Sequence, residues 1–527
     1  MTTSETPETS MALRSFIDKG LRHGRSLPAF VSYNTWYSYG TFVEEASMLA
    51  EMEMAAAIGV ELFVVDAGWW PGINTDDPGD FARAWGSWQV DPDRFPNGLG
   101  GLSDRAHELG MRFGVWVEPE RVDRQMVGRP GLAADRMLAM RDGRYDPGLP
   151  NNEFGSAQIC FGDPQARDFI LSKLSSFIED ARPDYLKWDN NFWINCNRAG
   201  HGHGSADGNF AHMRGVDMVR DELRARFPGM EIEDCSSGAN RLSLDMLAYS
   251  DATWLDDRTS PSGVVRHDLE GLLGIFPAPY LLTFAVTTEW EPMADNGDGA
   301  SDIPVIMRSR MPGMLGLSLR LGDMADGSLA SMAKQIDLYK RLRPILLDGV
   351  SFVLGPQQTS YPDAPWSGWD VTQHVSRTTG DSVLMAFETP DAPPSALVRP
   401  KGLKPDVMQH SGSLRYYGGR LTINYANLDS DWLDRSVAWL KEHGSHPYVL
   451  LESWEVEPFR KQFAGQKTLA ILDTPPVFKY VGGALITFYD LDPPPDRPIT
   501  TWNITETYTD RLRSTRPAPP PRIVLGQ

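Results

Sequence analysis

A lysine, an aspartate and two asparagines end one short apolar run of this chain, where their side chains could handle a hydroxyl-rich ligand. The run leads through Pro183–Leu186 into Lys187–Asn191, which reads Lys-Trp-Asp-Asn-Asn. A second strand-like run ends in Trp254–Arg258, which reads Trp-Leu-Asp-Asp-Arg. Two carboxylates delivered by different strands are the minimum that cleavage of a glycosidic bond requires. The two runs therefore predict acid–base and nucleophilic chemistry on a sugar.

Strand alternation decides which of these side chains can act together. Lys187 and Asp189 are two residues apart, so both point to the same side of a strand. Lys187 can keep Asp189 ionised and donate to a sugar hydroxyl. Asp256 and Asp257 are neighbours, so only one of them can face a shared pocket.

The elements that must position these residues form a repeating pattern between residue 29 and about residue 320. Short apolar runs alternate with helical patterns over Phe42–Ile58, Ser103–Leu109, Arg167–Ile178 and Ala211–Phe227. Parallel strands with crossover helices are typical of this pattern, and eight units predict an α/β fold of the (β/α)8 barrel type. A doubly wound open sheet is the alternative, but eight strands favour closure. The eight runs are Ala29–Trp36, Glu61–Ala67, Met111–Glu118, Asp184–Asp189, Met230–Cys235, Ala252–Asp257, Tyr280–Val286 and Pro312–Ser318.

Polar and aromatic residues gather at the carboxyl ends of six of these runs. Active sites of such barrels lie at that face. Helix caps would explain only one or two of the acids, so the pattern favours a site. The residues are Asn34, Trp36, Asp66, Glu118, Glu120, Lys187, Asp189, Cys235 and Asp257.

The rest of the chain predicts further parts around the barrel. We expect a tail over residues 1–28, the barrel over 29–350, a small β-domain over 351–410 and an atypical α/β segment over 411–527. The proline-rich end of the last segment is expected to be disordered. Within these parts the patterns predict helices over Met332–Leu347 and Leu433–His443, and strands over Trp369–His374, Ser382–Glu388, Ala396–Arg399, Tyr448–Leu451, Thr468–Leu472 and Ala484–Tyr489.

Composition narrows the class of protein. A net charge of −20 argues against nucleic acid and anionic membranes as partners, because both need a basic surface. Cys160, Cys196 and Cys235 are too few and too scattered for a disulfide framework. The N-terminal sequence lacks a signal-peptide pattern, and no apolar stretch is long enough to span a bilayer. We therefore expect a cytoplasmic protein.

One histidine-rich stretch could be taken for a metal site. His201, Gly202, His203 and Gly204 follow one another, and His212 lies beyond them. The glycines are flexible and no thiolate is expected beside the histidines, so a loop over the pocket entrance is the favoured interpretation. We expect no metal and no cofactor.

Several motifs, in order, resemble one known family over residues from about 30 to about 405. The motifs resemble those of glycoside hydrolase family 36, the melibiase family of α-galactosidases. They are Leu62–Trp70 (LFVVDAGWW), Gly86–Trp88 (GSW) with Arg94–Leu99 (RFPNGL), Gly110–Glu120 (GMRFGVWVEPE), Lys187–Asn191 (KWDNN), Glu233–Arg241 (EDCSSGANR) and Trp254–Asp257 (WLDD).

The resemblance implies a retaining exo-α-glycosidase, with an α-galactosidase favoured. Asp189 would be the nucleophile and Asp257 the acid–base residue, about 5–5.5 Å apart. Asp66 would bind a sugar hydroxyl, with Trp88 as a wall of the same pocket. Further substrate-binding residues would be Lys187, Asn191, Cys235, Ser237 and Gly238. Glu118 and Glu120 could bind or only support the rim, whereas Arg241 would brace a loop or pair with an acid.

The chain also departs from the family pattern. Ala67 stands where a second aspartate is usual, and Asp163 stands where an arginine is common. Both changes bear on which sugar is bound, because a buried hydroxyl without its partner costs roughly 1–3 kcal/mol. The N-terminal β-domain of many members is missing, so the oligomeric state is open. Residues after about 411 do not follow the family.

Other functions remain open from the sequence. A transglycosylase with raffinose-type galactosyl transfer would use the same catalytic residues and differ in how well its acceptor site excludes water. An α-N-acetylgalactosaminidase would differ in the sugar. A non-catalytic carbohydrate-binding barrel is a third possibility, although the presence of both carboxylates argues against it.

Overall fold

The structure is a computed structural model of the chain. It describes residues 7–73, 83–145, 155–287, 303–355, 368–388, 395–398 and 401, and the backbone of seven short strands beyond them.

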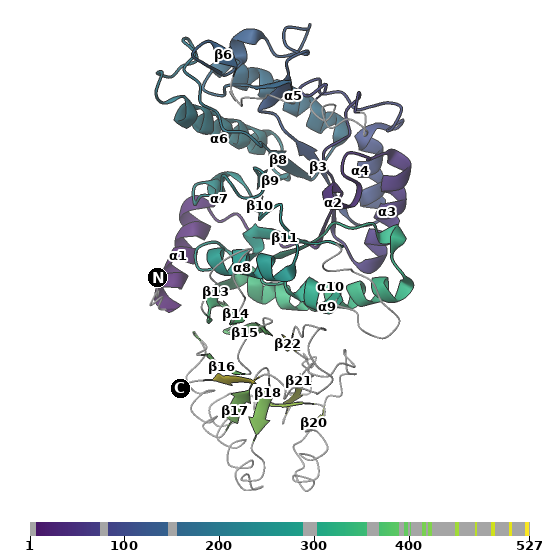
Figure 1. The fold of residues 1–527 in the computed structure, drawn as a ribbon, viewed down its shortest axis with the longest axis vertical. Coiled ribbons are helices and arrows are strands. Elements are labelled where there is room, and N and C mark those ends of the chain that lie inside the picture. Colours follow the sequence, from purple (N-terminus) through teal and green to yellow (C-terminus); the bar gives the residue numbers. More distant parts are fainter. Residues whose placement is uncertain are drawn as a thin grey trace.

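Eight parallel strands close into a barrel, which confirms the predicted α/β fold (Figure 1). Each of the eight barrel strands falls inside one of the eight apolar runs. The strands follow one another around the barrel in chain order, with β4–β7 left outside it. They are β1 (Ser32–Asn34), β2 (Leu62–Val65), β3 (Arg112–Val117), β8 (Tyr185–Asp189), β9 (Glu231–Cys235), β10 (Ala252–Trp254), β11 (Leu281–Ala285) and β12 (Met314–Leu317).

Helices cover the outside of the barrel, among them one at each of the four helical patterns named between its strands. Apolar side chains such as Phe63 and Val65 point outward into the core beneath the helices, whereas Val64 and Tyr185 point inward and pack with Trp254. This alternation delivers alternate side chains of each strand to the barrel interior. The covering helices include α3 (Glu45–Ile58), α4 (Gly98–Glu108), α5 (Pro164–Ala181), α6 (Gly208–Arg226), α8 (Ser262–Leu272), α9 (Ile303–Arg308) and α10 (Asp326–Asp348).

The segment before the barrel, predicted only as a tail, is helical from Pro7 onward. Helix α1 (Pro7–Phe16) continues into a π-helical turn over Ile17–Leu21. The buried guanidinium of Arg22 donates to Asp251 Oδ1 at 2.8 Å. This buried ion pair connects the N-terminal segment to the amino end of β10.

Antiparallel strands β13 (Gly349–Val353), β14 (Trp369–Ser376) and β15 (Ser382–Glu388) follow α10. They lie beside α8 and α10, below the barrel in Figure 1. The predicted strands of this part are thereby located, whereas the predicted helix Leu433–His443 lies outside the described residues. Arg522–Leu525 of the proline-rich end, expected to be disordered, form β23 beside β16 (Ser395–Val398).

Among the helices that the structure describes, none has the length and apolar character needed to cross a membrane.

The remaining strands, which lie outside the barrel, are short. The strands are β4 (Arg121–Asp123), β5 (Met140–Arg141), β6 (Arg144–Tyr145), β7 (Ser156–Gln158), β17 (Leu414–Tyr417), β18 (Arg420–Ile423), β19 (Tyr448–Glu452), β20 (Ala470–Ile471), β21 (Ile486–Asp490) and β22 (Thr505–Thr507).

Candidate active site

A cavity of about 310 Å³ opens at the carboxyl ends of the barrel strands. Seven of the predicted site residues line it, including both candidate catalytic aspartates. The lining consists of Trp36, Asp66, Ala67, Trp85, Trp116, Arg121, Lys187, Asp189, Asn191, Phe192, Cys235, Ser237 and Asp257.

Asp189 ends β8 and is buried at the floor of this cavity. Its Oδ2 accepts hydrogen bonds from Trp116 Nε1 at 3.2 Å and from Asn191 Nδ2 at 2.9 Å. Its Oδ1 accepts none from any residue that the structure describes. One oxygen of the carboxylate is thus held in place and the other is uncommitted.

Lys187 lies two residues before Asp189 on β8 and is almost fully buried. Its Nζ donates to Asp66 Oδ2 at 2.7 Å and lies 3.3 Å from the ring centre of Trp254. Burial opposes the charge, but the Asp66 carboxylate and the other acidic groups nearby, including Glu233 and Asp189, together outweigh it and raise the pKa of Lys187. Asn34 Nδ2 donates to the same Asp66 oxygen at 2.7 Å. The Lys187 side chain therefore keeps its positive charge, and it lies beneath Asp189 and Asp257.

Asp257 follows β10 and borders the opening of the cavity. Partial burial, together with the nearby Asp189 carboxylate, raises the pKa of Asp257, although Lys187 acts in the opposite direction. Asp256 is not part of the lining; its carboxylate accepts from Arg258 at 3.1 Å and lies against Asp268. The two neighbouring aspartates therefore face different surroundings.

Three predicted residues around β9 occupy different places. Cys235 is buried beside Asp189, which is its register partner, and burial raises the pKa of the thiol. Ser237 Oγ donates to Asn191 Oδ1 at 2.6 Å and so orients that amide. Gly238 lies outside the lining; a side chain there would come within 3.0 Å of the Asp256 Cα atom. Its role is to let the two loops approach each other.

Glu118 and Glu120, the two glutamates after β3, have different hydrogen-bond partners. Glu118 is buried against Arg121, with 3.0 Å between Oε1 and Nη1, and accepts from the Asn191 backbone amide at 3.0 Å. The Arg121 guanidinium lies between the rings of Trp85, at 3.7 Å, and Phe192, at 4.1 Å. Glu118 therefore positions the cation and aromatic rings that form one wall of the cavity.

Glu120 lies beneath the wall and joins four elements. It accepts from Trp188 Nε1 at 2.8 Å, Asn190 Nδ2 at 2.8 Å and His212 Nε2 at 2.6 Å. Burial acts to raise the pKa of Glu120. Arg241 forms a bidentate ion pair with this carboxylate and acts in the opposite direction, and the pKa of Glu120 is lowered. This carboxylate supports the loop around Asp189 from outside the cavity, and Arg241 pairs with an acid as predicted.

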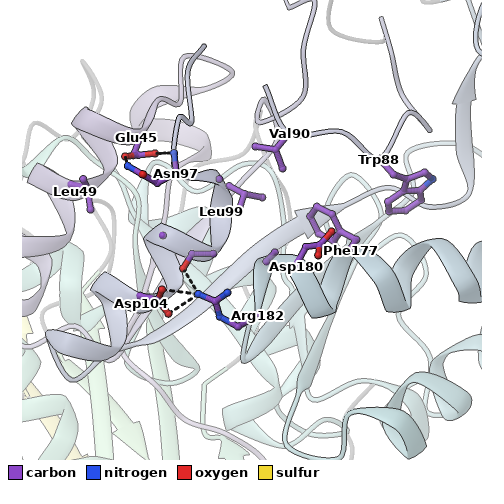
Figure 2. A pocket seen from close by; sticks show the side chains of 14 residues that line it. Glu45, Leu49, Trp88, Val90, Asn97, Leu99, Asp104, Phe177, Asp180 and Arg182 are labelled. Atoms are coloured by element: carbon purple, nitrogen blue, oxygen red, sulfur yellow. Dashed lines mark hydrogen bonds and ion pairs between the residues drawn. The ribbon is translucent and has the colours of Figure 1, made fainter. Parts of the chain in front are cut away.

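Trp88 and Asp163 do not line this cavity, although Trp88 borders a small neighbouring cavity together with Trp85 and Trp116. Trp88 packs edge-on against Phe177 of α5, 6.0 Å between ring centres, and lines a separate cavity of about 760 Å³ (Figure 2). Two acids of that larger cavity have partners: Glu45 accepts from Asn97 Nδ2 at 2.6 Å, and Asp104 pairs with Arg182 at 2.7 Å. Asp163 caps α5 by accepting from the Gln165 backbone amide at 3.0 Å. Of the two departures from the family pattern, only Ala67 borders the candidate site.

Sequence reasoning missed several residues of the cavity wall. Trp85, Trp116, Arg121 and Phe192 were not predicted as site residues, although Trp116 lies in one of the quoted motifs. Tyr37, which donates to the Asp257 backbone carbonyl at 2.6 Å, was also missed. Only the tryptophans at strand ends gave a signal, since loop aromatics have no periodic pattern.

Comparison with known proteins adds to this geometry. The sequence profile of the Melibiase family matches residues 11–349. The chain belongs to the Melibiase family. The match runs from α1 to the start of β13, so it covers the whole barrel of this melibiase-family chain.

Curated relatives agree with the profile. "Probable alpha-galactosidase C" of Aspergillus terreus is 28% identical over 74% of this chain and 50% of the relative. "Alpha-galactosidase" of Escherichia coli is 34% identical over 81% of this chain and 54% of the relative. The chain thus spans about half the length of the curated relatives it matches.

Solved structures show the same fold. The GH36 α-galactosidase AgaA from Geobacillus stearothermophilus superposes with a TM-score of 0.61 at 22% identity, over 78% of this chain and 54% of the other. The α-galactosidase from Lactobacillus brevis gives a TM-score of 0.61 at 23% identity, over 77% and 52%. The melibiase-family barrel is therefore shared even where few residues are.

Proposed function

We propose that the protein is a retaining exo-α-glycosidase that hydrolyses terminal α-linked galactose-type sugars. The observation that carries the proposal is that Asp189 and Asp257, from different strands, border one cavity in a melibiase-family barrel. The relatives named as α-galactosidases support the choice of sugar. The substrate would be an oligosaccharide or another glycoside.

In the first step Asp189 attacks the anomeric carbon. Its Oδ1 is free of hydrogen bonds to described residues, whereas Trp116 and Asn191 hold Oδ2. As the new carbon–oxygen bond forms, the glycosidic bond breaks, and Asp257 gives its proton to the departing oxygen. The raised pKa of Asp257 suits it to carry that proton.

In the second step Asp257 acts as a base. It takes a proton from water, the water oxygen attacks the same carbon, and the bond to Asp189 breaks. The sugar leaves with its original anomeric configuration. Lys187 and Asp66, which form a buried pair beside both carboxylates, would donate to and accept from sugar hydroxyls during both steps.

Ala67 is the position that bears on the sugar. It lines the cavity next to Asp66, and its methyl group cannot accept a hydrogen bond from a hydroxyl. A sugar hydroxyl at that point has to use another partner. Galactose-type preference then rests on Asp66, Lys187 and the aromatic wall.

A panel of aryl α-glycosides tests the function. We expect turnover of galactose, and comparison with N-acetylgalactosamine, glucose and arabinose ranks the sugars. The anomer of the first product, followed by NMR, reports the stereochemistry. Binding of sugars without turnover of any member would reject the enzyme, and a product of inverted configuration would reject the double displacement.

A further inference from the structure

Two cysteines and two histidines from separate segments meet outside the catalytic cavity. Cys160 follows β7, whereas Cys196, His201 and His203 belong to the loop between β8 and α6. Their four ligand atoms lie within 4.8 Å of one another. Sequence reasoning set aside a histidine metal site for want of a nearby thiolate. That premise is wrong, because Cys196 lies five residues before His201 and the fold brings Cys160 beside His203. His212 is elsewhere, bonded to Glu120.

The distances suit a tetrahedral ion. Cys160 Sγ lies 3.4 Å from His203 Nε2, and Cys196 Sγ lies 3.5 Å from His201 Nδ1. Zinc–sulfur bonds of about 2.3 Å and zinc–nitrogen bonds of about 2.0–2.1 Å at a tetrahedral angle place sulfur and nitrogen about 3.5 Å apart. The two sulfur–nitrogen separations therefore match edges of a zinc-centred tetrahedron.

The outer nitrogens of both histidines are already fixed. His201 Nε2 lies 2.7 Å from the Arg136 carbonyl oxygen, and His203 Nδ1 lies 2.8 Å from the Gly204 carbonyl oxygen. A carbonyl can only accept, so each outer nitrogen carries the proton. The nitrogen facing the cysteines is then the one with a lone pair. Histidines that bind metals are oriented in this way by outer hydrogen bonds.

Glycines make the room that this arrangement needs. A side chain at Gly162 would come within 2.5 Å of His203 Cδ2, and one at Gly208 would come within 1.9 Å of the Cys196 carbonyl oxygen. Cys160 and Cys196 are fully buried with Ala139 and Ile194 in a small apolar cluster. The cluster is enclosed, and neutral thiols are weak partners for imidazoles in such a place.

We propose that Cys160, Cys196, His201 and His203 bind one structural zinc ion. Four protein ligands leave no open position, which is typical of a structural site rather than a catalytic one. Thiolate sulfur with imidazole nitrogen at tetrahedral spacing favours zinc among the common metals.

The ion would join the loop after β8 to the segment before α5. That loop also carries Asn191 and Phe192, which line the catalytic cavity. His212, at the start of α6, accepts from the Phe161 backbone amide at 3.0 Å beside the same segment. Zinc would thus stabilise the loop that holds the wall of the cavity. The proposal does not depend on the reaction at Asp189.

Elemental analysis of the full-length protein, produced with zinc and freed of loose metal, tests the site. We expect about one zinc per chain in the wild type and near none in Cys160→Ser or Cys196→Ser. The matched control is Cys235→Ser, at the buried cysteine outside the cluster, which should keep its zinc. Cobalt in place of zinc should give the visible bands of a tetrahedral site and a thiolate charge-transfer band. Wild type without bound metal, or Cys196→Ser with full zinc, would overturn the proposal.

Two further measurements cover variants that fail to fold. Removing metal from the wild type with a strong chelator should lower Tm, and added zinc should restore it. An unchanged Tm after complete removal would argue against a structural ion. Mass spectrometry of the alkylated, unreduced protein should find both thiols free once zinc is removed under denaturing conditions. A Cys160–Cys196 disulfide would overturn the zinc site, and iron in place of zinc would overturn the metal assignment.

Discussion

Lys187 and Asp66 form a buried ion pair of 2.7 Å that joins β8 to β2 inside the barrel. The ring of Trp254 on β10 covers the same ammonium at 3.3 Å. One cation therefore connects three strands at the level of the catalytic cavity. Asp66 in turn accepts from Asn34 on β1, which extends the connection to a fourth strand.

Replacing Lys187 by methionine should destabilise the protein by about 3–5 kcal/mol, because the Asp66 carboxylate is left buried without its cation. The double variant Lys187→Met/Asp66→Asn removes that charge as well and should recover part of the loss. Urea unfolding of the wild type, both single variants and the double variant measures the coupling. A double variant with the summed loss of the two single variants would contradict the argument.

Asp189→Asn should reduce hydrolysis to background while leaving the fold intact. Asparagine is the same size and keeps an oxygen that can accept from Trp116, but it cannot form the glycosyl-enzyme. Circular dichroism and Tm check the fold, and an aryl galactoside checks the activity. Rates like those of the wild type would remove Asp189 as the nucleophile.

Asp257→Ala should slow poor leaving groups by about 10²–10⁴-fold and good leaving groups much less, since the latter need little protonation. A series of aryl galactosides with different phenol pKa values measures this dependence. Asp256→Asn is the matched control, because Asp256 pairs with Arg258 outside the cavity and should keep its activity. Equal losses for all leaving groups in Asp257→Ala would point to Asp256 instead.

Much of the fold was predictable because strands and helices have local periodic signatures. All eight barrel strands lie inside apolar runs of the sequence, and α5 begins at a capping aspartate followed by Pro164. The placement of Lys187 and Asp189 on one side of β8 also followed from alternation alone. Residues on strands could therefore be brought to one cavity without a structure.

Loop packing could not be predicted in the same way. Trp85 lines the cavity and Trp88, three residues on, faces Phe177 instead, although both lie in one glycine-containing loop. Cys160 and His203 meet across 43 residues for no periodic reason. Such contacts depend on how long loops fold over the barrel, which hydrophobic spacing does not record.

The pH dependence of kcat/KM should show an alkaline limb above the usual range of an aspartate. Asp257 must hold its proton to act as an acid, and burial raises its pKa, so the active form persists to higher pH and is lost as pH rises through that value. Substrates with poor leaving groups should show this limb strongly. An activated aryl galactoside should show it weakly, because it needs no acid in the first step. An identical limb for both substrates would assign it to another group.

The substitution Glu233→Gln should stabilise the protein, relative to the wild type, more at pH 8 than at pH 5. Glu233 is fully buried inside the barrel, accepts from Tyr185 at 2.8 Å, and burial raises its pKa to about 7. Its unfolded value is about 4.3, so the folded state binds the extra proton between these values, and stability falls as pH rises through that window. The difference corresponds to roughly 3–4 kcal/mol.

Glutamine mimics the protonated acid and does not bear this penalty. The stability of Glu233→Gln minus that of the wild type, from urea unfolding, should therefore increase between pH 5 and pH 8. Glu108→Gln is the control, since that side chain is exposed on α4 and should give a nearly constant difference. A constant difference for Glu233→Gln as well would mean that Glu233 is ionised in the folded protein throughout this range, with Lys187 as its compensating charge.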